Sequence, residues 1–206
     1  MIRSIVIILV VLSVNFLTAD AKAQYGFVEF QAQAESGLFV PTVDLLVGGT
    51  IAKTRFGTLG VEGFALVSDG WAELYAGPTW TIIPELTIGL FAGMETGPET
   101  LPRFATTVIV NYEEFSFFGA VEFNTRSFDG EQTGLWYRLV ATGSATSWLK
   151  VGVEWRRFAG LGPHVAVKIP ETPVGLWVSW MPLEPEGLDG NIVNLDRFLL
   201  GGKVGF

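Results

Sequence analysis

Apolar residues alternate with polar or small residues along most of the chain after about residue 25. In residues 86–95 (LTIGLFAGME), one parity holds Leu, Ile, Leu, Ala and Met, and the other holds Thr, Gly, Phe, Gly and Glu. Residues 104–112 (FATTVIVNY) and 148–156 (WLKVGVEWR) alternate in the same way. A period of two residues indicates β-strands with one apolar face and one polar or small face. Because residues 25–206 contain no clear 3.6-residue period, the sequence predicts an all-β fold.

The alternation predicts about twelve strands, most of them close to the roughly 9–11 residues that a tilted strand needs to cross a bilayer. The boundaries of the eighth to tenth strands are the least well defined, and ten strands is the alternative. The predicted strands cover residues 25–35, 42–53, 57–67, 71–81, 86–95, 103–112, 115–124, 133–142, 148–158, 163–169, 174–181 and 195–206.

The connections between these strands fall into two classes. One class is short and has the sequences TRF, IIPE, EE, GSATS and IPETP. The other class contains TGPETLP, TRSFDGEQ, AGLG and LEPEGLDGNIVN, most of them longer, with the tight SDG as an exception. Short turns at one end and longer loops at the other are typical of a closed barrel in an outer membrane. An even number of strands places both chain ends on the short-turn side.

Composition supports a barrel in lipid. The chain has 206 residues, enough for one domain, and is 49% hydrophobic with 25 Gly and 13% aromatic residues. Its mean hydropathy is +0.41. Residues 25–206 nevertheless contain no uninterrupted apolar run of about 18 residues. This combination is typical of a β protein whose outer face meets lipid.

Charge and residue usage exclude several classes of function. The formal net charge of -8 disfavours a nucleic-acid partner, because an acidic chain repels phosphate backbones. The chain has no Cys, and His164 is its single imidazole. Disulfides and thiolate metal sites are therefore excluded, and few zinc sites or His-based catalytic groups remain possible.

The first 23 residues have the features of a secretory signal peptide. Arg3 supplies a positive start, residues 5–12 are apolar, and Ala-Lys-Ala at 21–23 fits a small-x-small cleavage pattern. An N-terminal membrane anchor is the alternative, and Ser13 and Asn15 disfavour it by interrupting the apolar stretch. The predicted organisation is a signal peptide at 1–23 and a single transmembrane barrel domain at 24–206.

Aromatic residues on the apolar parity gather near the strand ends. Such groups would form two belts at the levels of the lipid headgroups. The expected belt beside the short turns contains Trp80, Tyr112, Phe115 and Phe206, and the one beside the longer loops contains Phe104, Phe123, Tyr137, Trp155 and Trp180.

The chain finishes with RFLLGGKVGF, in which Phe198, Leu200, Val204 and Phe206 share one parity. An alternating closing strand that ends on Phe resembles the C-terminal signature of bacterial outer-membrane β-barrel proteins of the broad porin-like class. The resemblance implies a closed antiparallel barrel in the bacterial outer membrane, in contact with its lipid. It also implies that these four residues are an assembly signal for the barrel-assembly machinery.

The opposite parity carries most of the charge in the strands and should face the lumen. The first five strands contribute only acids and the last five contribute nearly all the bases, so a closed barrel would have an acidic and a basic wall. The inward acids are Glu29, Asp44, Glu62, Glu73, Glu95, Glu122 and Glu154, and the inward bases are Arg103, Arg138, Lys150, Arg156, Lys168, Arg197 and Lys203.

Two interpretations of this lumen remain open. In one, the walls line a narrow channel for passive diffusion of small hydrophilic solutes or ions. Its selectivity would be set by Glu62, Glu73, Glu122, Arg138, Lys150, Glu154 and Arg156. In the other, the charges pair and fill a non-conducting barrel that has a structural role or binds a partner through its loops.

The uncharged inward residues support neither interpretation alone, because some would leave the lumen open and others would fill it. An eight-stranded barrel is just filled by side chains, so a twelve-stranded barrel should leave room. Small residues would add space at Gly60, Gly77, Gly89, Gly93, Gly152 and Gly175. Large ones would occupy it at Phe64, Tyr75, Phe91, Phe118, Trp136 and Trp177.

No catalytic residue, metal site or cofactor is predicted. A deacylase-like barrel would require Ser two residues from His on the lipid face. Here Ala166 stands two residues after His164, and both residues have inward parity. The adjacent Glu113 and Glu114 are explained by a solvated turn rather than by glycoside hydrolysis. The loop at 183–194 and the residues after it could offer calcium oxygen ligands without EF-hand spacing, and a solvated loop is favoured. Those candidate ligands are Glu184, Glu186, Asp189, Asn191, Asn194 and Asp196.

Overall fold

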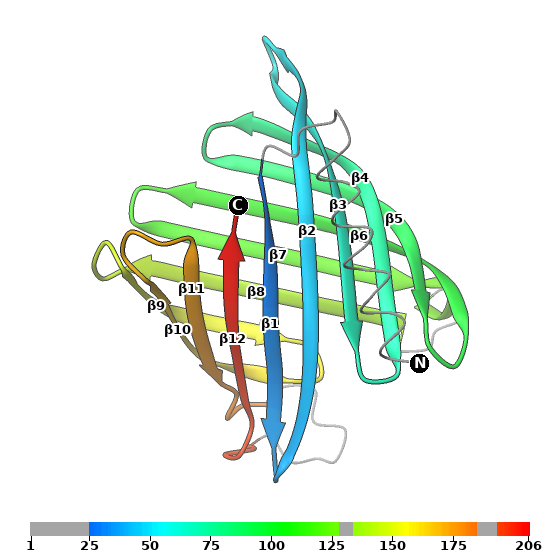
Figure 1. Cartoon of the computed structure of the whole chain (residues 1–206), viewed down its shortest axis with the longest axis vertical. Coiled ribbons are helices and arrows are strands. Elements are labelled where there is room, and N and C mark those ends of the chain that lie inside the picture. Colours follow the sequence, from blue (N-terminus) through cyan, green and yellow to red (C-terminus); the bar gives the residue numbers. More distant parts are fainter. Residues whose placement is uncertain (1–24, 128–133, 185–192) are drawn as a thin grey trace.

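The chain forms a closed antiparallel β-barrel. A computed structural model describes residues 25–127, 134–184 and 193–206. Over these residues, twelve strands each pair with the next in sequence, and the last pairs with the first (Figure 1). The strands are β1 (Tyr25–Glu35), β2 (Leu38–Thr54), β3 (Gly57–Ser68), β4 (Trp71–Ile83), β5 (Leu86–Thr96), β6 (Thr100–Tyr112), β7 (Phe115–Asn124), β8 (Leu135–Ser144), β9 (Leu149–Arg156), β10 (Gly160–Lys168), β11 (Val174–Trp180) and β12 (Phe198–Gly205).

The twelve-strand prediction is confirmed, and the ten-strand alternative is wrong. The largest difference in a boundary is at β2, which begins at Leu38 rather than at residue 42. Ser36 and Gly37 alone make the turn before it, both with positive φ, as a two-residue hairpin turn of the primed type requires. The strands therefore stay paired up to the turn, and the register runs through Pro41, which lies opposite Ala32.

Helical structure is minor in the described residues. A 3-10 turn, η1 (Thr125–Ser127), follows β7. None of the helices in these residues is long and apolar enough to cross a membrane.

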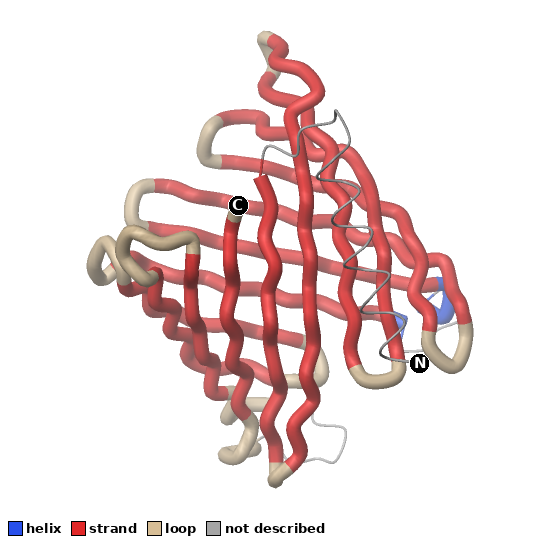
Figure 2. Tube along the Cα trace, in the orientation of Figure 1, coloured by secondary structure: helices blue, strands red, loops and turns tan. Residues whose placement is uncertain are grey.

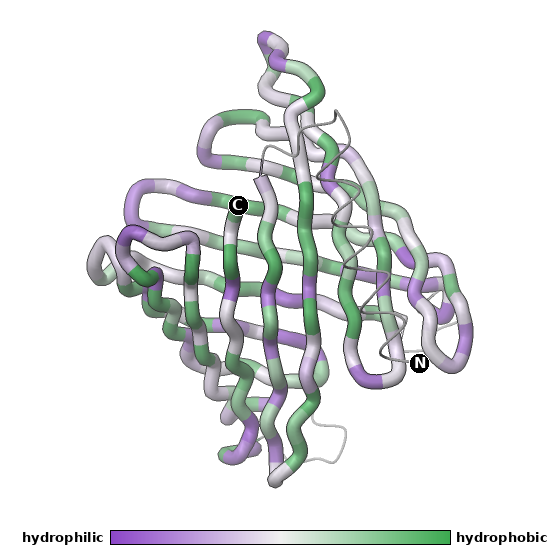
Figure 3. Tube along the Cα trace, viewed as in Figure 1, coloured by the Kyte–Doolittle hydropathy of each residue, from purple (hydrophilic) through white to green (hydrophobic). Residues whose placement is uncertain are grey.

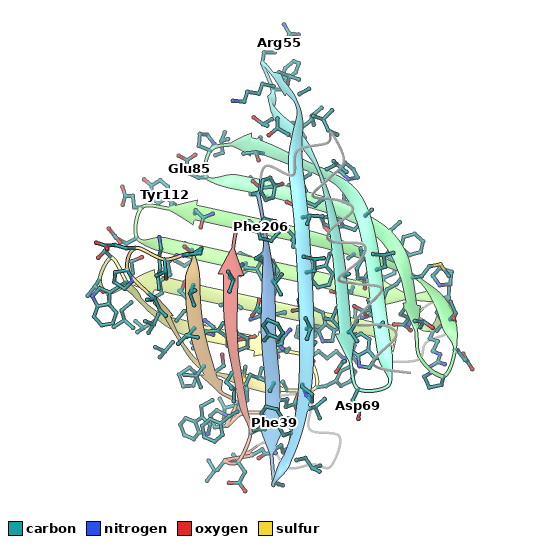
Figure 4. All side chains as sticks on the ribbon, in the orientation of Figure 1. Phe39, Arg55, Asp69, Glu85, Tyr112 and Phe206 are labelled. Carbon is teal, nitrogen blue, oxygen red and sulfur yellow. The ribbon has the colours of Figure 1, made fainter. Side chains whose placement is uncertain are left out.

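The two ends of the barrel differ less than the sequence suggested. Arg55, Glu85 and Tyr112 lie at the same end as Phe206, and Phe39 and Asp69 lie at the other (Figure 4). At the Phe39 end, the strands continue almost to the turns. The predicted long loop TGPETLP therefore shrinks to residues 97–99, and the shorter connection AGLG becomes residues 157–159 (Figure 2). Only the connections at 125–134 and 181–197 are long. The asymmetry predicted for an outer-membrane barrel is therefore carried by two loops.

The strands are apolar outside and charged inside. On β9, Val151 and Val153 are 44% and 51% exposed, whereas Glu154 is completely buried. Figure 3 shows the same alternation of apolar and polar positions along the other strands. Exposed apolar groups around buried charges reverse the arrangement of a water-soluble domain and suit a barrel surrounded by lipid. The predicted inward and outward parities are confirmed.

Aromatic side chains make cross-strand contacts on the outer face. Phe104 and Phe123 stack with ring centroids 5.5 Å apart, and Tyr137 and Trp155 meet edge to face at 5.2 Å. Trp180 also stacks on Phe198. These pairs join adjacent strands near the end with the long loops, where one of the two belts was expected.

The inward glycines do not open the lumen in the way that the sequence suggested. A Cβ atom on Gly93 would lie only 1.8 Å from the backbone oxygen of Leu74, and Gly77 and Gly152 are equally close to neighbouring strands. Glycine is needed at these positions because two backbones approach closely. Gly175 differs, since its Cβ would meet nothing closer than 3.7 Å.

We expect Gly93→Ala to lower the free energy of unfolding by about 3 kcal/mol, because a backbone must shift to admit the methyl group. Gly175→Ala is the matched control and should change the free energy of unfolding by less than about 0.5 kcal/mol. Urea titration of the barrel in phospholipid vesicles measures both. Equal losses in the two variants would contradict this explanation of Gly93.

The closing strand completes the barrel. Positions 198–205 of β12 pair with 27–34 of β1, and Gly26 and Phe206 exchange two backbone hydrogen bonds of 3.0 Å. Phe198, Leu200, Val204 and Phe206 are all exposed on the outer face. Their role as an assembly signal stays a prediction. The predicted signal peptide at residues 1–23 lies outside the described residues and also stays a prediction.

Candidate functional site: the charged lumen

The inward charges form separate groups rather than one ring. The Arg103 cluster consists of Glu73, Glu95, Arg103 and Glu122 on β4 to β7. The Glu154 cluster consists of Arg138, Glu154, Arg156, His164 and Ser179 on β8 to β11. A third group is a set of lysines beside the short turns.

One guanidinium organises the Arg103 cluster. Arg103 Nη1 lies 2.9 Å from Glu73 Oε1, and Nη2 lies 3.0 Å from Glu122 Oε2. Arg103 also pairs with Glu95, which lies directly opposite Glu73 across β4 and β5. The Tyr75 hydroxyl donates to Glu122 Oε2 at 2.9 Å. Like charges on facing positions destabilise a sheet, so this buried cation is what allows the three carboxylates to lie together.

A completely buried carboxylate organises the Glu154 cluster. Glu154 Oε1 accepts hydrogen bonds from Arg138 Nε at 2.8 Å and from Arg156 Nη2 at 2.9 Å. Glu154 Oε2 accepts one from the Ser179 hydroxyl at 2.6 Å and lies 3.1 Å from His164 Nδ1. Both oxygens are therefore hydrogen-bonded, and the single negative charge of the carboxylate is shared by two guanidinium groups.

The basic wall reaches the acidic wall through hydrogen bonds. Arg156 Nη1 donates to Gln31 Oε1 at 2.8 Å, and Gln31 Nε2 donates to Asp44 Oδ2 at 2.5 Å. Trp177 Nε1 donates to Glu29 Oε1 at 2.5 Å, and Glu29 and Asp44 are directly opposite on β1 and β2. Acids of β1 and β2 thus face bases of β8 and β9, and polar side chains bridge part of the lumen between them.

The predicted selectivity residues separate into these groups. Glu73 and Glu122 join the Arg103 cluster, and the Glu154 cluster takes Arg138, Glu154 and Arg156. Glu62 lies apart on β3 and accepts a hydrogen bond from the Tyr25 hydroxyl at 2.7 Å. Lys150 lies beside the short turns and donates to Ser116 Oγ at 2.8 Å.

Two central residues, Arg103 and Ser179, are not among the predicted selectivity residues. Arg103 was recognisable, because it is the only inward base predicted on the first seven strands. Ser179 was not, because only the strand register reveals that it lies directly opposite His164.

A cavity of about 290 Å³ opens at the short-turn end. Its lining includes inward side chains of β9 to β12 and residues of the turn between β8 and β9. Lys150, Lys168, Lys203, Trp148 and Trp177 are among them. Three lysines against the single carboxylate of Glu114 give the lining a net positive charge.

At the opposite rim, Arg197, just before β12, forms hydrogen bonds with three other segments of the chain. Its guanidinium donates to the Ala159 backbone oxygen, to Glu184 Oε1 at 2.9 Å and to Glu35 Oε1 at 2.6 Å. Burial by itself lowers the pKa of Arg197, but the hydrogen bonds to Glu35 and Glu184 raise it above its ordinary value. Arg197 therefore remains a cation and holds segment 181–184 against β1.

These contacts engage part of the proposed calcium loop. Glu184 bonds to Arg197, and Asn194 Nδ2 donates to Glu35 Oε1 at 2.6 Å. The candidate ligands Glu186, Asp189 and Asn191 lie outside the described residues. In the described part of the chain, no three His, Asp or Glu side chains are placed to hold a metal ion.

Solved structures share this architecture, whereas no protein-family model and no curated protein matches the sequence. The KdgM porin aligns with a TM-score of 0.53 and 10% identity, covering 87% of this chain and 99% of that one. Omp33 of Acinetobacter baumannii aligns at 0.51 and 11%, covering 88% and 96%. The fold is that of porin-like outer-membrane β-barrels.

The porin-like fold by itself does not select a function. Outer membrane phospholipase A from Escherichia coli also aligns, with a TM-score of 0.52 and 8% identity, covering 93% of this chain and 96% of that one. The choice between a channel and an enzyme must therefore come from the side chains of this chain.

Within this porin-like barrel, Glu154, His164 and Ser179 have the residue types of a catalytic triad but a different hydrogen-bond pattern. Because Ser179 donates its one proton to Glu154, His164 Nδ1 must be the donor across the 2.7 Å contact to Ser179 Oγ. An activated serine would instead donate to the imidazole. Ser179 is also completely buried, which leaves its hydroxyl inaccessible. This hydrogen-bond pattern therefore differs from that of an activated serine.

Proposed function

We propose that the protein is a narrow channel of the bacterial outer membrane for passive diffusion of small hydrophilic solutes or ions. The observation that carries the proposal is the opposition of charged walls inside a barrel with an apolar exterior. Glu29 and Asp44 line one wall, and Arg138 and Arg156 line the other. Fixed charges of opposite sign in a confined aqueous space orient polar solutes and select ions.

Several contacts support a narrow passage. The hydrogen bond from Arg156 to Gln31 spans part of the lumen. Tyr75 and Phe91 point inward and are 2% and 8% exposed, so they occupy interior volume. We infer that any solute passing through is small.

The same contacts favour a second candidate, a non-conducting barrel with a structural or loop-binding role. In that case the Arg103 and Glu154 clusters fill the lumen, and function resides in the loops. The two candidates differ in one measurable property, which is conductance.

The deciding experiment is planar-bilayer recording of the chain purified from outer-membrane fractions, after heat-modifiable gel migration has shown that it is folded. We expect small unitary steps with an ion preference. A folded barrel that inserts but stays silent would support the non-conducting candidate. Recovery of the chain only from other cell fractions would contradict the proposed location.

We expect Lys150→Gln and Arg156→Gln each to lower the anion-to-cation permeability ratio by about threefold to tenfold, because each removes a fixed positive charge from the passage. The exposed Lys53 on β2 lies outside the cavity, and Lys53→Gln is the matched control that should leave the ratio unchanged. Reversal potentials in a salt gradient measure the ratio. An unchanged ratio in folded variants at both lumen positions would overturn the assigned selectivity residues.

A further inference from the structure

The basic cavity at the short-turn end is lined by four consecutive strands, β9 to β12. Its lysines come from β9 (Lys150), β10 (Lys168) and β12 (Lys203). In the strand register, Gly175 of β11 lies opposite both Lys168 and Lys203. Ala166 likewise lies opposite Lys150. Small residues between the lysines leave the space that the cavity occupies.

These lysines differ from the lumen arginines because none of them forms a salt bridge with a carboxylate in the described part of the chain, although Glu29 lies directly opposite Lys203 in the strand register. Arg103, Arg138, Arg156 and Arg197 each pair with at least one glutamate. By contrast, Lys150 bonds to a serine, Lys203 Nζ lies 3.5 Å from the centroid of the Phe27 ring, and Lys168 Nζ makes no ion pair with described residues.

Three lysines line one small space, and their like charges repel one another. Their mutual repulsion weakens when an anion enters, and the attraction is stronger in a partly enclosed cavity than in bulk water. Glu114 is the one acidic residue in the lining, so the lining keeps a net positive charge.

Trp177 connects this cavity to the middle of the lumen. Its ring is part of the cavity lining and stacks on His164 with centroids 5.7 Å apart. The guanidinium of Arg138 lies 5.0 Å from the same ring. An anion held by the lysines would therefore next meet the arginines of the Glu154 cluster.

We propose that this cavity is a binding vestibule for a small solute that carries an oxyanion, either a carboxylate or a phosphate group. Its volume of about 290 Å³ lies at the lower end of ligand sites and suits a small molecule. The inference rests on the proposed channel function and names the class of solute that the channel admits.

The test is isothermal titration of the refolded barrel with succinate and with inorganic phosphate, in non-ionic detergent and an amine buffer. We expect saturable binding at one site that weakens as salt is added. Lys168→Gln should weaken binding by about threefold to fivefold, the value of one partly exposed ion pair. Neutralising all three lysines should abolish it.

A second variant keeps every charge and removes the space. A Cβ on Gly175 meets only ordinary van der Waals contact, so Gly175→Leu can fold and place its side chain in the cavity. It should abolish binding of both anions. Lys53→Gln removes the same charge outside the cavity and should leave affinity unchanged.

Lipid headgroups carry the same phosphate chemistry, so titration is repeated in vesicles with and without phosphatidylglycerol. Succinate binding that persists in both supports a soluble ligand. Loss of succinate and phosphate binding only in phosphatidylglycerol would overturn it, because a headgroup then occupies the cavity.

Different results would contradict the vestibule proposal and the channel proposal. A barrel that conducts but binds neither anion, or one in which Lys53→Gln acts as strongly as Lys168→Gln, overturns the vestibule and leaves the channel. A barrel that binds succinate through Lys168 but stays silent in bilayers overturns the channel and leaves the anion site.

Discussion

Glu154→Gln should lower the free energy of unfolding of the barrel by about 3–5 kcal/mol, the cost of removing one partner from a buried ion pair. Glu154 is completely buried, and both of its oxygens are hydrogen-bonded. The substitution leaves Arg138 and Arg156 side by side without their shared counter-charge. It also places an amide donor where a carboxylate oxygen accepts from Ser179 or the arginines.

Urea titration in phospholipid vesicles, followed by tryptophan fluorescence, measures this loss. Glu99→Gln is the matched control, because Glu99 pairs with Arg126 at 2.7 Å with its side chain 63% exposed. An exposed ion pair contributes about 0–1 kcal/mol. Losses that agree within about 1 kcal/mol in the two variants would contradict the role assigned to Glu154.

A second substitution tests whether the charges of the cluster act together. Arg156→Gln added to Glu154→Gln removes one of the two unpaired cations, so it should recover part of the lost free energy. If the double variant loses the sum of two independent effects, the cluster does not act as an electrostatic unit.

Arg103→Met should lower the free energy of unfolding by a similar amount, about 3–5 kcal/mol, because it leaves Glu73, Glu95 and Glu122 without their common cation. Arg103 is 7% exposed and pairs with all three. Methionine keeps much of the volume of the side chain, so the loss reports charge more than packing. The same urea titration at neutral pH measures it.

Neutralising the acids should rescue this variant. Glu73→Gln and Glu122→Gln are each expected to destabilise the wild-type barrel, but to stabilise the barrel that carries Arg103→Met. Arg126→Met, at an exposed pair, is the control and should change stability by less than about 1 kcal/mol. Absence of rescue would show that the three carboxylates do not depend on Arg103.

Together the two clusters connect stability to the proposed function. They hold charged side chains at fixed positions, as selection requires, and they also occupy the lumen, which limits the size of any solute. The lysines of the proposed vestibule are different, because none of them forms a salt bridge with a carboxylate of the described residues, although Glu29 faces Lys203. Stability should therefore depend mainly on the clusters, whereas capture of an anion should depend on the lysines.

Much of this barrel follows from local sequence. A strand places successive side chains on opposite faces, so the alternation around Val151, Val153 and Glu154 predicted which side faces lipid. Strand number followed from the same alternation and from the turn residues between strands. The exaggerated loop asymmetry had a local cause as well, because Gly and Pro in TGPETLP indicate a loop although β6 begins at Thr100.

The sequence by itself therefore determined the closed all-β architecture and the face of the barrel that the charged residues of the predicted strands occupy. Only the tertiary structure decided which charges meet, because strand register and barrel closure bring together residues as distant in sequence as Gln31 and Arg156. His164 and Ser179 became partners through register, and Gly93 proved necessary for close backbone contact rather than for an open lumen. Parity is a local property of the backbone, whereas pairing across a lumen depends on how every strand is tilted and staggered.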